Sequence, residues 1–426
     1  MRFKKVFFIL IFLLVSCFVF SEESLTISKI RIIIQDAEYL WTKETDIELV
    51  NEIESFISPY TVVSYSSLFP GKKITQENLE EEVKRTQLRL SDSGLFYTAS
   101  VEIVPPRKNP AERTIIISVT EGFLHRFSGG YAYAMYGLEG LGGKRSSLYT
   151  YAGWNLLGLS WAHENLFNKG YILAASAESR DLFPSLVNES KYEHSLSGGL
   201  HAGKYLTSDL GLTLYTGLKY TPSMQFFSDL LFYTGPVIRV HRYEFKPFDF
   251  SWNTETSAFW FVNQESCKIE SKWAFRKNFF QEFFEEKGKG QKLNLSVSLS
   301  GGYENDSAPF SIAFNLYDTA DRSVRSGYSK EALIGSSYCL FSSELRWNSI
   351  SLKIPPAFSC IPQVFLYTDI AFVDVKDTSS VFSLRDAFGG GARILLDNPI
   401  FAYFTFAFGW NHEGKGRFVF SATGGY

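Results

Sequence analysis

The sequence predicts a β-rich membrane protein in which a small N-terminal α+β domain precedes an antiparallel transmembrane β-barrel. Three observations carry this prediction. The chain of 426 residues is 17% aromatic, with 40 Phe and 23 Tyr, although its net charge is only −3. After the N-terminal segment no apolar run is long enough for a membrane helix. From about residue 124, short segments alternate between apolar and mixed side chains, which is typical of barrel strands.

The N-terminus, "MRFKKVFFILIFLLVSCFVFSEES", predicts export from the cytoplasm. Three basic residues precede an apolar run from Val6 to about Phe20, and this order is typical of a secretory signal. Small residues before Glu22 suit cleavage there, so we assign 1–21 to a signal peptide. Cys17 also lies in a segment that resembles a lipoprotein cleavage site, and lipidation of this cysteine stays open as an alternative.

Residues 22–123 predict the α+β domain, with its elements in the order β-α-α-β-β. The expected elements are a strand at 25–35, helices at 44–57 and 75–94, and strands at 97–106 and 113–122. The first helix rests on the spacing of Ile47, Val50 and Ile53. The second helix has Thr75 as a suitable N-cap and Gly94 as a suitable C-terminal stop.

Residues 124–426 predict the barrel. In "FAYFTFAFGW" the even positions from 402 to 410 are apolar and mostly aromatic, and a soluble sandwich rarely exposes such a stripe. A membrane sheet must close, because hydrocarbon offers unpaired backbone groups no partner. Fifteen candidate strands can be counted, among them 126–136, 147–163 and 308–317. Bacterial barrels have an even number, so we expect about sixteen strands, or else about fourteen. We expect the missed strand within 246–290.

Several stretches resemble the Omp85 family of outer-membrane proteins. "LRLSDSGLFYTASVEIVPP" and the later "ISVTEG" are similar to a POTRA domain, the periplasmic module of that family. The run Val324-Arg325-Ser326-Gly327-Tyr328 resembles the family's loop signature Val/Ile-Arg-Gly-Phe/Tyr, with a serine inserted. Glu344-Leu345-Arg346 is similar to the family's next strand, and the expected four strands follow it. The resemblance implies a bacterial outer-membrane barrel with its N-terminal domain in the periplasm.

Arg325 is the most informative residue of that loop, because a guanidinium group offers a rigid donor fork for a carboxylate. The alternation of its strand places Asp369 on the face toward the lumen. This strand is the second one after the loop, and in the family it carries an aspartate that binds the arginine. Glu344 is the second candidate, on the same face of the intervening strand as Arg346. A loop arginine without a fixed partner is the remaining alternative.

The C-terminal segment "RFVFSATGGY" resembles the closing strand and targeting signal of outer-membrane proteins. Phe418, Phe420 and Tyr426 supply its apolar and terminal aromatic positions, and Gly424 with Gly425 weakens strand pairing. In Omp85 insertases the first and last strands part to form a lateral gate, which a weak closing strand would suit. A frayed chain end explains the glycines equally well.

Enzymatic activity is not expected. No catalytic motif occurs, no metal-ligand spacing is present, and no cofactor is implied. The small net charge, without a block of like charges, argues against nucleic-acid binding.

The resemblance implies ATP-independent insertion or translocation of proteins, in which the POTRA-like domain captures clients by strand addition. The expected partners are the lipid bilayer, unfolded outer-membrane or secreted client proteins, and periplasmic accessory proteins. Two alternatives stay open: a dedicated secretion pore of the two-partner type, and a surface-exposed barrel, such as an antigen or adhesin, without insertase activity.

Overall fold

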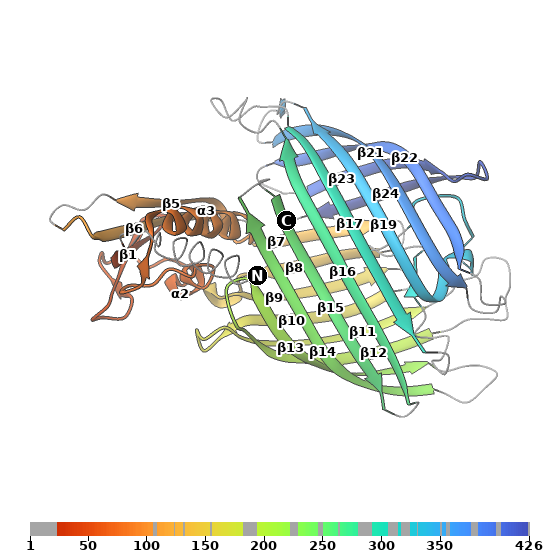
Figure 1. Cartoon of the computed structure of the whole chain (residues 1–426), viewed down its shortest axis with the longest axis horizontal. Coiled ribbons are helices and arrows are strands. Elements are labelled where there is room, and N and C mark those ends of the chain that lie inside the picture. Colours follow the sequence, from red (N-terminus) through yellow and green to blue (C-terminus); the bar gives the residue numbers. More distant parts are fainter. Residues whose placement is uncertain are drawn as a thin grey trace, which may run out of the picture.

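The computed structural model consists of a small α+β domain at one end of a large β-barrel (Figure 1). We call the barrel end that faces this domain the near end, and the opposite end the far end. The structure is described for residues 24–104, 109–122, 124–130, 133–153, 156–181, 194–221, 229–245, 250–262, 265–279, 292–305, 314–316, 324–329, 331–349, 352–354, 358–375, 382–397 and 402–424. The proposed signal peptide, 1–21, therefore lies outside the described residues.

The N-terminal domain is one sheet covered by helix. The sheet has the order β3-β2-β1-β6-β5, and β4 pairs with the start of β1. Its elements are β1 (Leu25–Ile34), β2 (Ala37–Thr42), β3 (Glu48–Leu49), α2 (Pro59–Val63), β4 (Lys73–Ile74), α3 (Gln76–Asp92), β5 (Phe96–Val104) and β6 (Glu112–Glu121).

The central strand β1 shows how the sequence sets the core of this domain. It pairs in parallel with β6 and antiparallel with β2, so the strand is enclosed on both edges. A bulge between Ile27 and Lys29 inserts one residue and shifts the alternation, so that Ile30 and Ile32 face the same core as Ile27. The partial alternation in the sequence therefore has a structural cause.

Helix α3 begins and ends where the sequence predicts. The side chain of Thr75 accepts a hydrogen bond from the backbone N–H of Asn78, which satisfies one otherwise unpaired donor of the first turn. Gly94 follows the helix with φ of 71°, in the left-handed region that glycine adopts without strain. Buried Leu79, Val83 and Leu90 pack the helix onto the sheet.

The helix predicted at 44–57 is wrong. This segment instead forms the short edge strand β3 and a series of turns. The Asn51 side chain accepts a hydrogen bond from the Glu38 backbone N–H at 2.9 Å and donates to the Asp36 carbonyl at 2.6 Å. The Ser55 hydroxyl donates to the Ile57 carbonyl at 2.7 Å. Such side-chain bonds to the backbone compete with helix formation, and here they outweigh the apolar spacing.

The barrel contains sixteen long antiparallel strands among the described residues, and the predicted fold class is confirmed. They are β7 (His125–Gly130), β8 (Tyr133–Glu139), β9 (Ser146–Gly153), β10 (Leu156–Leu166), β11 (Tyr171–Asp181), β12 (His194–Tyr205), β13 (Leu210–Thr221), β14 (Asp229–Glu244), β15 (Phe250–Phe261), β16 (Ser266–Phe279), β17 (Lys292–Glu304), β19 (Ile334–Asn348), β21 (Phe358–Val375), β22 (Ser383–Asp397), β23 (Ala402–Trp410) and β24 (Gly416–Gly424). The short β18 (Phe314–Asn315) and β20 (Leu352–Ile354) pair beside β19 and β21.

The strand count from the sequence needs three corrections. Segments 126–136 and 147–163 are each two strands, β7 with β8 and β9 with β10. Segment 308–317 contributes only the two residues of β18 among the described positions. The described residues of 246–290 form the two strands that were predicted there, β15 and β16, and no further one. Closely spaced hairpins keep the alternation nearly in phase across the turn, which hides them in the pattern.

The two faces of the strands differ as the alternation predicts. On β23 the aromatic side chains at even positions, from Phe404 to Trp410, are exposed on the outer face, whereas Thr405 and Ala407 are buried on the inner face. A continuous exposed apolar belt of this kind suits lipid and not water. None of the described helices is both long and apolar enough to cross a bilayer.

The strand ring closes through a short contact between β24 and β7, which we call the seam. Among the described residues three pairs join these strands, Ser421 with Gly130, Ala422 with Gly129 and Thr423 with Ser128. The neighbouring pair β23 and β24 shares nine residue pairs. Between neighbours among the sixteen long strands, the seam therefore has the fewest described residue pairs.

Candidate functional site

The described lid loop, 324–329, lies against the inner wall of the barrel and is held there by Arg325. Its Nε and Nη2 donate to the two carboxylate oxygens of Asp369, each at 2.9 Å, and its backbone N–H donates to Asp369 Oδ2 at 3.1 Å. Nη1 donates to Glu344 Oε2 at 2.8 Å. Asp369 is completely buried. This fork-to-carboxylate geometry fixes both the position and the orientation of the loop.

Glu344 is the centre of a larger charged network. Besides Arg325 it contacts Arg346 Nε and accepts from Arg393, whose Nη1 lies at 2.5 Å and Nη2 at 3.2 Å. Three guanidinium groups therefore surround two carboxylates, which leaves a formal charge of +1 (3 − 2). Each buried charge has a partner, and this is the condition under which such a network is tolerated. Within the described chain, no cluster of His, Cys, Asp and Glu is arranged to hold a metal ion.

Tyr367 supports the arginine from the other side. The guanidinium carbon of Arg325 lies 3.8 Å from the centroid of the Tyr367 ring, a cation–π contact. The Tyr367 hydroxyl donates to the Arg325 carbonyl at 2.9 Å. The ring and the loop backbone both pass Gly409, where a Cβ would lie 2.0 Å from Tyr367 Oη and 2.2 Å from Arg325 O. Glycine is therefore required at this position of β23.

The tip of the loop docks on the far-end hairpin between β23 and β24. The Tyr328 hydroxyl donates to Asp386 Oδ1 at 2.7 Å, and His412 Nδ1 lies 2.5 Å from the same oxygen. The backbone N–H of Gly327 donates to Lys415 O at 3.3 Å, and a Cβ on Gly327 would lie 2.7 Å from the Lys415 carbonyl carbon. The loop is thus attached at two places: its arginine inside the barrel and its tip at the far end.

The sequence left two acids open as the partner of Arg325, and the structure brings the arginine to both. Arg346 reaches Glu344 from its own strand. Ser326, the insertion relative to the family signature, is completely buried, and its backbone N–H donates to the Val324 carbonyl at 3.0 Å. The extra residue is taken up as a tight local turn. The functional role of these residues stays a prediction.

Four members of the site were not predicted: Arg393, the hydroxyl function of Tyr367, and the pair Asp386 and His412. Arg393 could have been found by phase, because its neighbour Ile394 is exposed on the outer face and the arginine must then face inward. Asp386 and His412 meet only because a hairpin turn lies beside the loop tip, and nothing in the local sequence signals this contact.

The C-terminal residues lie on the strand that forms the seam. Phe418 is exposed on the outer face, and the ring of Phe420 packs against that of Phe406 with centroids 5.1 Å apart. Gly424 pairs with Ala402 of β23 at the near end of β24. The predicted positions 425–426 lie outside the described residues.

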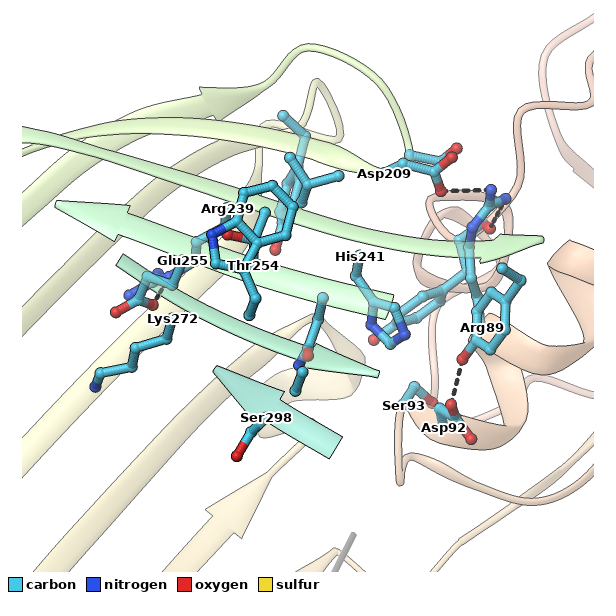
Figure 2. A pocket seen from close by; sticks show the side chains of 18 of the residues that line it. Arg89, Asp92, Ser93, Asp209, Arg239, His241, Thr254, Glu255, Lys272 and Ser298 are labelled. Carbon is cyan, nitrogen blue, oxygen red and sulfur yellow. Dashed lines mark hydrogen bonds and ion pairs between the residues drawn. The ribbon is translucent and has the colours of Figure 1, made fainter. Parts of the chain in front are cut away.

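A second polar site joins the N-terminal domain to the near end of the barrel (Figure 2). Arg89 of α3 donates to Glu82 at 2.8 Å within its own helix and to Asp209, in the turn between β12 and β13, at 2.6 Å. Asp92 accepts a hydrogen bond from the hydroxyl of Tyr243 on β14. The last turns of α3 are therefore anchored to the turn between β12 and β13 and to strand β14.

Arg145, in the near-end turn after β8, forms the other half of this junction. Its guanidinium carbon lies 4.3 Å from the ring centroid of Tyr65 in the domain and 4.9 Å from that of Tyr205 in the barrel. Nη2 donates to Glu164 at 2.7 Å. Burial raises the pKa of Tyr65 to about 12, so its ring stays neutral and serves as a cation–π partner.

Between these anchors lies a cavity of about 510 Å³. Figure 2 shows side chains of α3, including Arg89 and Asp92, on one side and barrel side chains such as Lys272 on the other. Acidic, basic and apolar side chains all line its wall, and Arg239 and Glu255 form an ion pair there at 2.6 Å. The cavity lies between α3 and the strands β14 to β17 of the barrel.

The fold is similar to that of known barrels. CdiB from Acinetobacter baumannii matches with a TM-score of 0.55 and 12% identity over 95% of this chain and 74% of that chain. CdiB from Escherichia coli matches with a TM-score of 0.54 and 10% identity over 96% of this chain and 92% of that chain. BamA from Haemophilus ducreyi lacking POTRA domains 1-3 matches with a TM-score of 0.46 and 11% identity, over 91% and 89% of the two chains. No family model and no curated protein sequence matches the chain.

Proposed function

We propose that the protein is an Omp85-type factor that inserts proteins into the bacterial outer membrane without ATP. The loop signature around Arg325, its carboxylate partners and the four long strands after β19 support this assignment. So does the fold shared with the two CdiB barrels over almost the whole chain. The exposed apolar belt suits a bilayer as the surrounding medium.

The observation that carries the insertase function is the short seam. Because the free energy of opening a strand contact rises with the number of backbone hydrogen bonds that it breaks, the seam, with three described residue pairs, costs less to open than the other contacts between long strands. Once open, β7 and β24 expose backbone donors and acceptors to which a client strand can add. Gly129, Gly130 and Gly424 contribute no side chains that would hold the seam closed.

The N-terminal domain captures the client in this proposal. Its sheet ends in β3 on one side and β5 on the other, and an outer strand of this kind can accept an additional strand by backbone pairing. The anchors of Arg89 and Arg145 hold the domain at the near end, so a captured segment is delivered to the barrel rim. The energy for insertion comes from client folding and burial of apolar surface in lipid, and no nucleotide is needed.

A dedicated secretion pore is the second candidate, and the cavity between α3 and the barrel, with charged groups in its wall, favours it. A cavity lined by paired charges beside the barrel interior would suit passage of an unfolded polar chain. Passage through the lumen would require the lid loop to leave Asp369 and Glu344. The hydrogen bonds of Arg325 to these two carboxylates oppose that movement.

Depletion of the protein in its host, followed by quantification of the other outer-membrane barrels, tests the proposal. An insertase predicts that many barrels decrease together. Loss of one secreted protein with unchanged barrels would establish the secretion pore instead. Normal growth with no change in either would contradict both and favour a surface barrel without transport activity.

A further inference from the structure

The segment 44–57, which was predicted to be a helix and is not, forms an unusual surface on the N-terminal domain. Four large apolar side chains point to solvent there: Leu49 is 40% exposed, Val50 55%, Ile53 51% and Phe56 57%. The acidic residues Glu48, Glu52 and Glu54 alternate with them and are also exposed. We call these seven residues the acidic apolar patch. Exposed apolar groups gathered in this way mark interaction surfaces more often than scattered ones do.

The patch is held in a fixed conformation. The Val50 backbone N–H donates to the Glu38 carbonyl at 2.8 Å, and the Ser55 backbone N–H donates to the Tyr39 hydroxyl at 3.1 Å. The Ile57 backbone N–H donates to Glu121 Oε1 at 2.7 Å, and the Ile57 side chain is completely buried. Because the backbone is already ordered, binding to this surface would cost little conformational entropy.

Charge decides which partner fits. Between residues 43 and 56 the sequence has five acidic residues and one lysine. Arg31, across the sheet edge, is already paired with Glu38 at 2.7 Å. A second copy of this chain would set like charges opposite each other in a symmetric contact. A lipid surface would place the carboxylates beside phosphate groups. A basic partner satisfies both the apolar and the acidic members.

We propose that the acidic apolar patch is the docking surface for a basic amphipathic segment of a partner protein. The patch lies next to the barrel rim, because the Ser58 backbone N–H donates to the Gly143 carbonyl at 2.8 Å just beyond its end. A partner docked there sits beside the near end of the barrel. This inference does not depend on whether the barrel inserts or secretes its clients.

Binding of a labelled synthetic helical peptide of leucine and lysine to the full-length protein in detergent micelles gives the first test. We expect Ile53→Ser with Phe56→Ser, and separately Glu52→Gln with Glu54→Gln, to weaken binding at least about tenfold, which is about 1.4 kcal/mol. The matched control, Leu88→Ser with Glu102→Gln, changes an exposed apolar and an exposed acidic residue elsewhere on the same domain and is expected to bind like the wild type. Equal loss in the control, no loss in the patch variants, or equal binding of a leucine–glutamate peptide overturns the proposal.

A photo-crosslinking residue at position 53 of the full-length protein in its native membrane gives the second test. We expect an adduct with a protein segment rich in lysine and arginine, whose yield falls in the Glu52→Gln, Glu54→Gln variant. A crosslinking residue at position 88 is expected to give no such adduct. Adducts only with lipid, adducts with a second copy of the chain, or a yield that ignores the charge change overturn the proposal.

Discussion

Two walls of the barrel differ sharply in how they are held. The tether wall, β19 to β23, has thirteen residue pairs between β19 and β21 and fifteen between β21 and β22. The lid loop adds a buried charged network across the inner face of that wall. The seam has three residue pairs among the described residues. The loop therefore braces the wall with many strand pairs and leaves the seam without a comparable charged network among the described contacts.

The lid loop also links the two regions physically. Its tip contacts Lys415, in the hairpin that leads into β24, through the backbone of Gly327. A loop held by Asp369 therefore restrains the far end of the closing strand while the near end stays weakly paired. Loss of the contact between Arg325 and Asp369 should therefore destabilise both the tether wall and the seam.

The largest effect is expected from Arg325→Ala. The substitution leaves Asp369 buried without a countercharge, and breaking a buried pair in this way costs about 3–5 kcal/mol of unfolding free energy. Thermal unfolding in detergent and the depletion phenotype in a complementation assay measure the losses in stability and in function. A matched control is Arg242→Ala, whose exposed ion pair with Glu244 is expected to matter by less than about 1 kcal/mol.

Exchanging the charges of Arg325 and Asp369 tests the same contact in a second way. The double variant Arg325→Asp, Asp369→Arg is expected to recover part of the stability and function that Arg325→Ala loses, because the pair is restored with its polarity exchanged. If Arg325→Ala unfolds at the wild-type temperature and supports growth equally well, the tether has no role.

Arg89→Ala is expected to have the next largest effect, and at a different place. The substitution removes a hydrogen bond to Asp209 across the domain junction, and hydrogen bonds between charged groups contribute about 1.5–3 kcal/mol. Distances between spin labels on the domain and on the barrel should broaden while the unfolding temperature of the barrel stays nearly constant. An unchanged distance distribution would mean that the remaining contacts, among them those of Arg145 and Asp92, are enough to hold the junction.

Tyr367→Phe is expected to cost about 1–3 kcal/mol, since it leaves the Arg325 carbonyl without its hydrogen bond while keeping the ring under the guanidinium group. Tyr367→Ala should cost more, because it also removes the cation–π contact. Thermal unfolding of both variants separates the two contributions. Equal losses would assign the whole effect to the hydroxyl group and none to the ring.

His412→Ala is expected to have the smallest effect, below about 1 kcal/mol, because the side chain is mostly exposed and its contact with Asp386 is screened by solvent. Hydrogen exchange of the far-end hairpin is the sensitive measurement. A large loss of barrel stability would show that the loop tip, and not Arg325, is the main attachment.

The features that could be predicted from the sequence are those that depend on the alternation of apolar side chains and on local signals. Barrel and strand phase followed from apolar periodicity, and Thr75 and Gly94 marked the ends of α3 because capping is local chemistry. The partners of Arg325 followed from phase together with the family resemblance. The segment 44–57 was mispredicted because the Asn51 side chain binds the backbone of Glu38 and the Ser55 backbone N–H binds the Tyr39 hydroxyl, and only the folded sheet brings these residues near. Arg145 between its two tyrosines likewise joins three distant segments.

The most direct test of the account is a disulfide across the seam. In a variant without native cysteines, Gly129→Cys with Ala422→Cys would join β7 to β24, and Ala407→Cys with Val419→Cys would join β23 to β24 as a control; both are registered pairs, at a separation that a disulfide can bridge. The measurement is insertion of a client barrel into liposomes that contain each variant, with and without reductant. If clients enter the membrane through the seam, the seam disulfide abolishes insertion, reductant restores it, and the control disulfide has no effect. Insertion at the control rate with the seam locked would contradict entry through the seam.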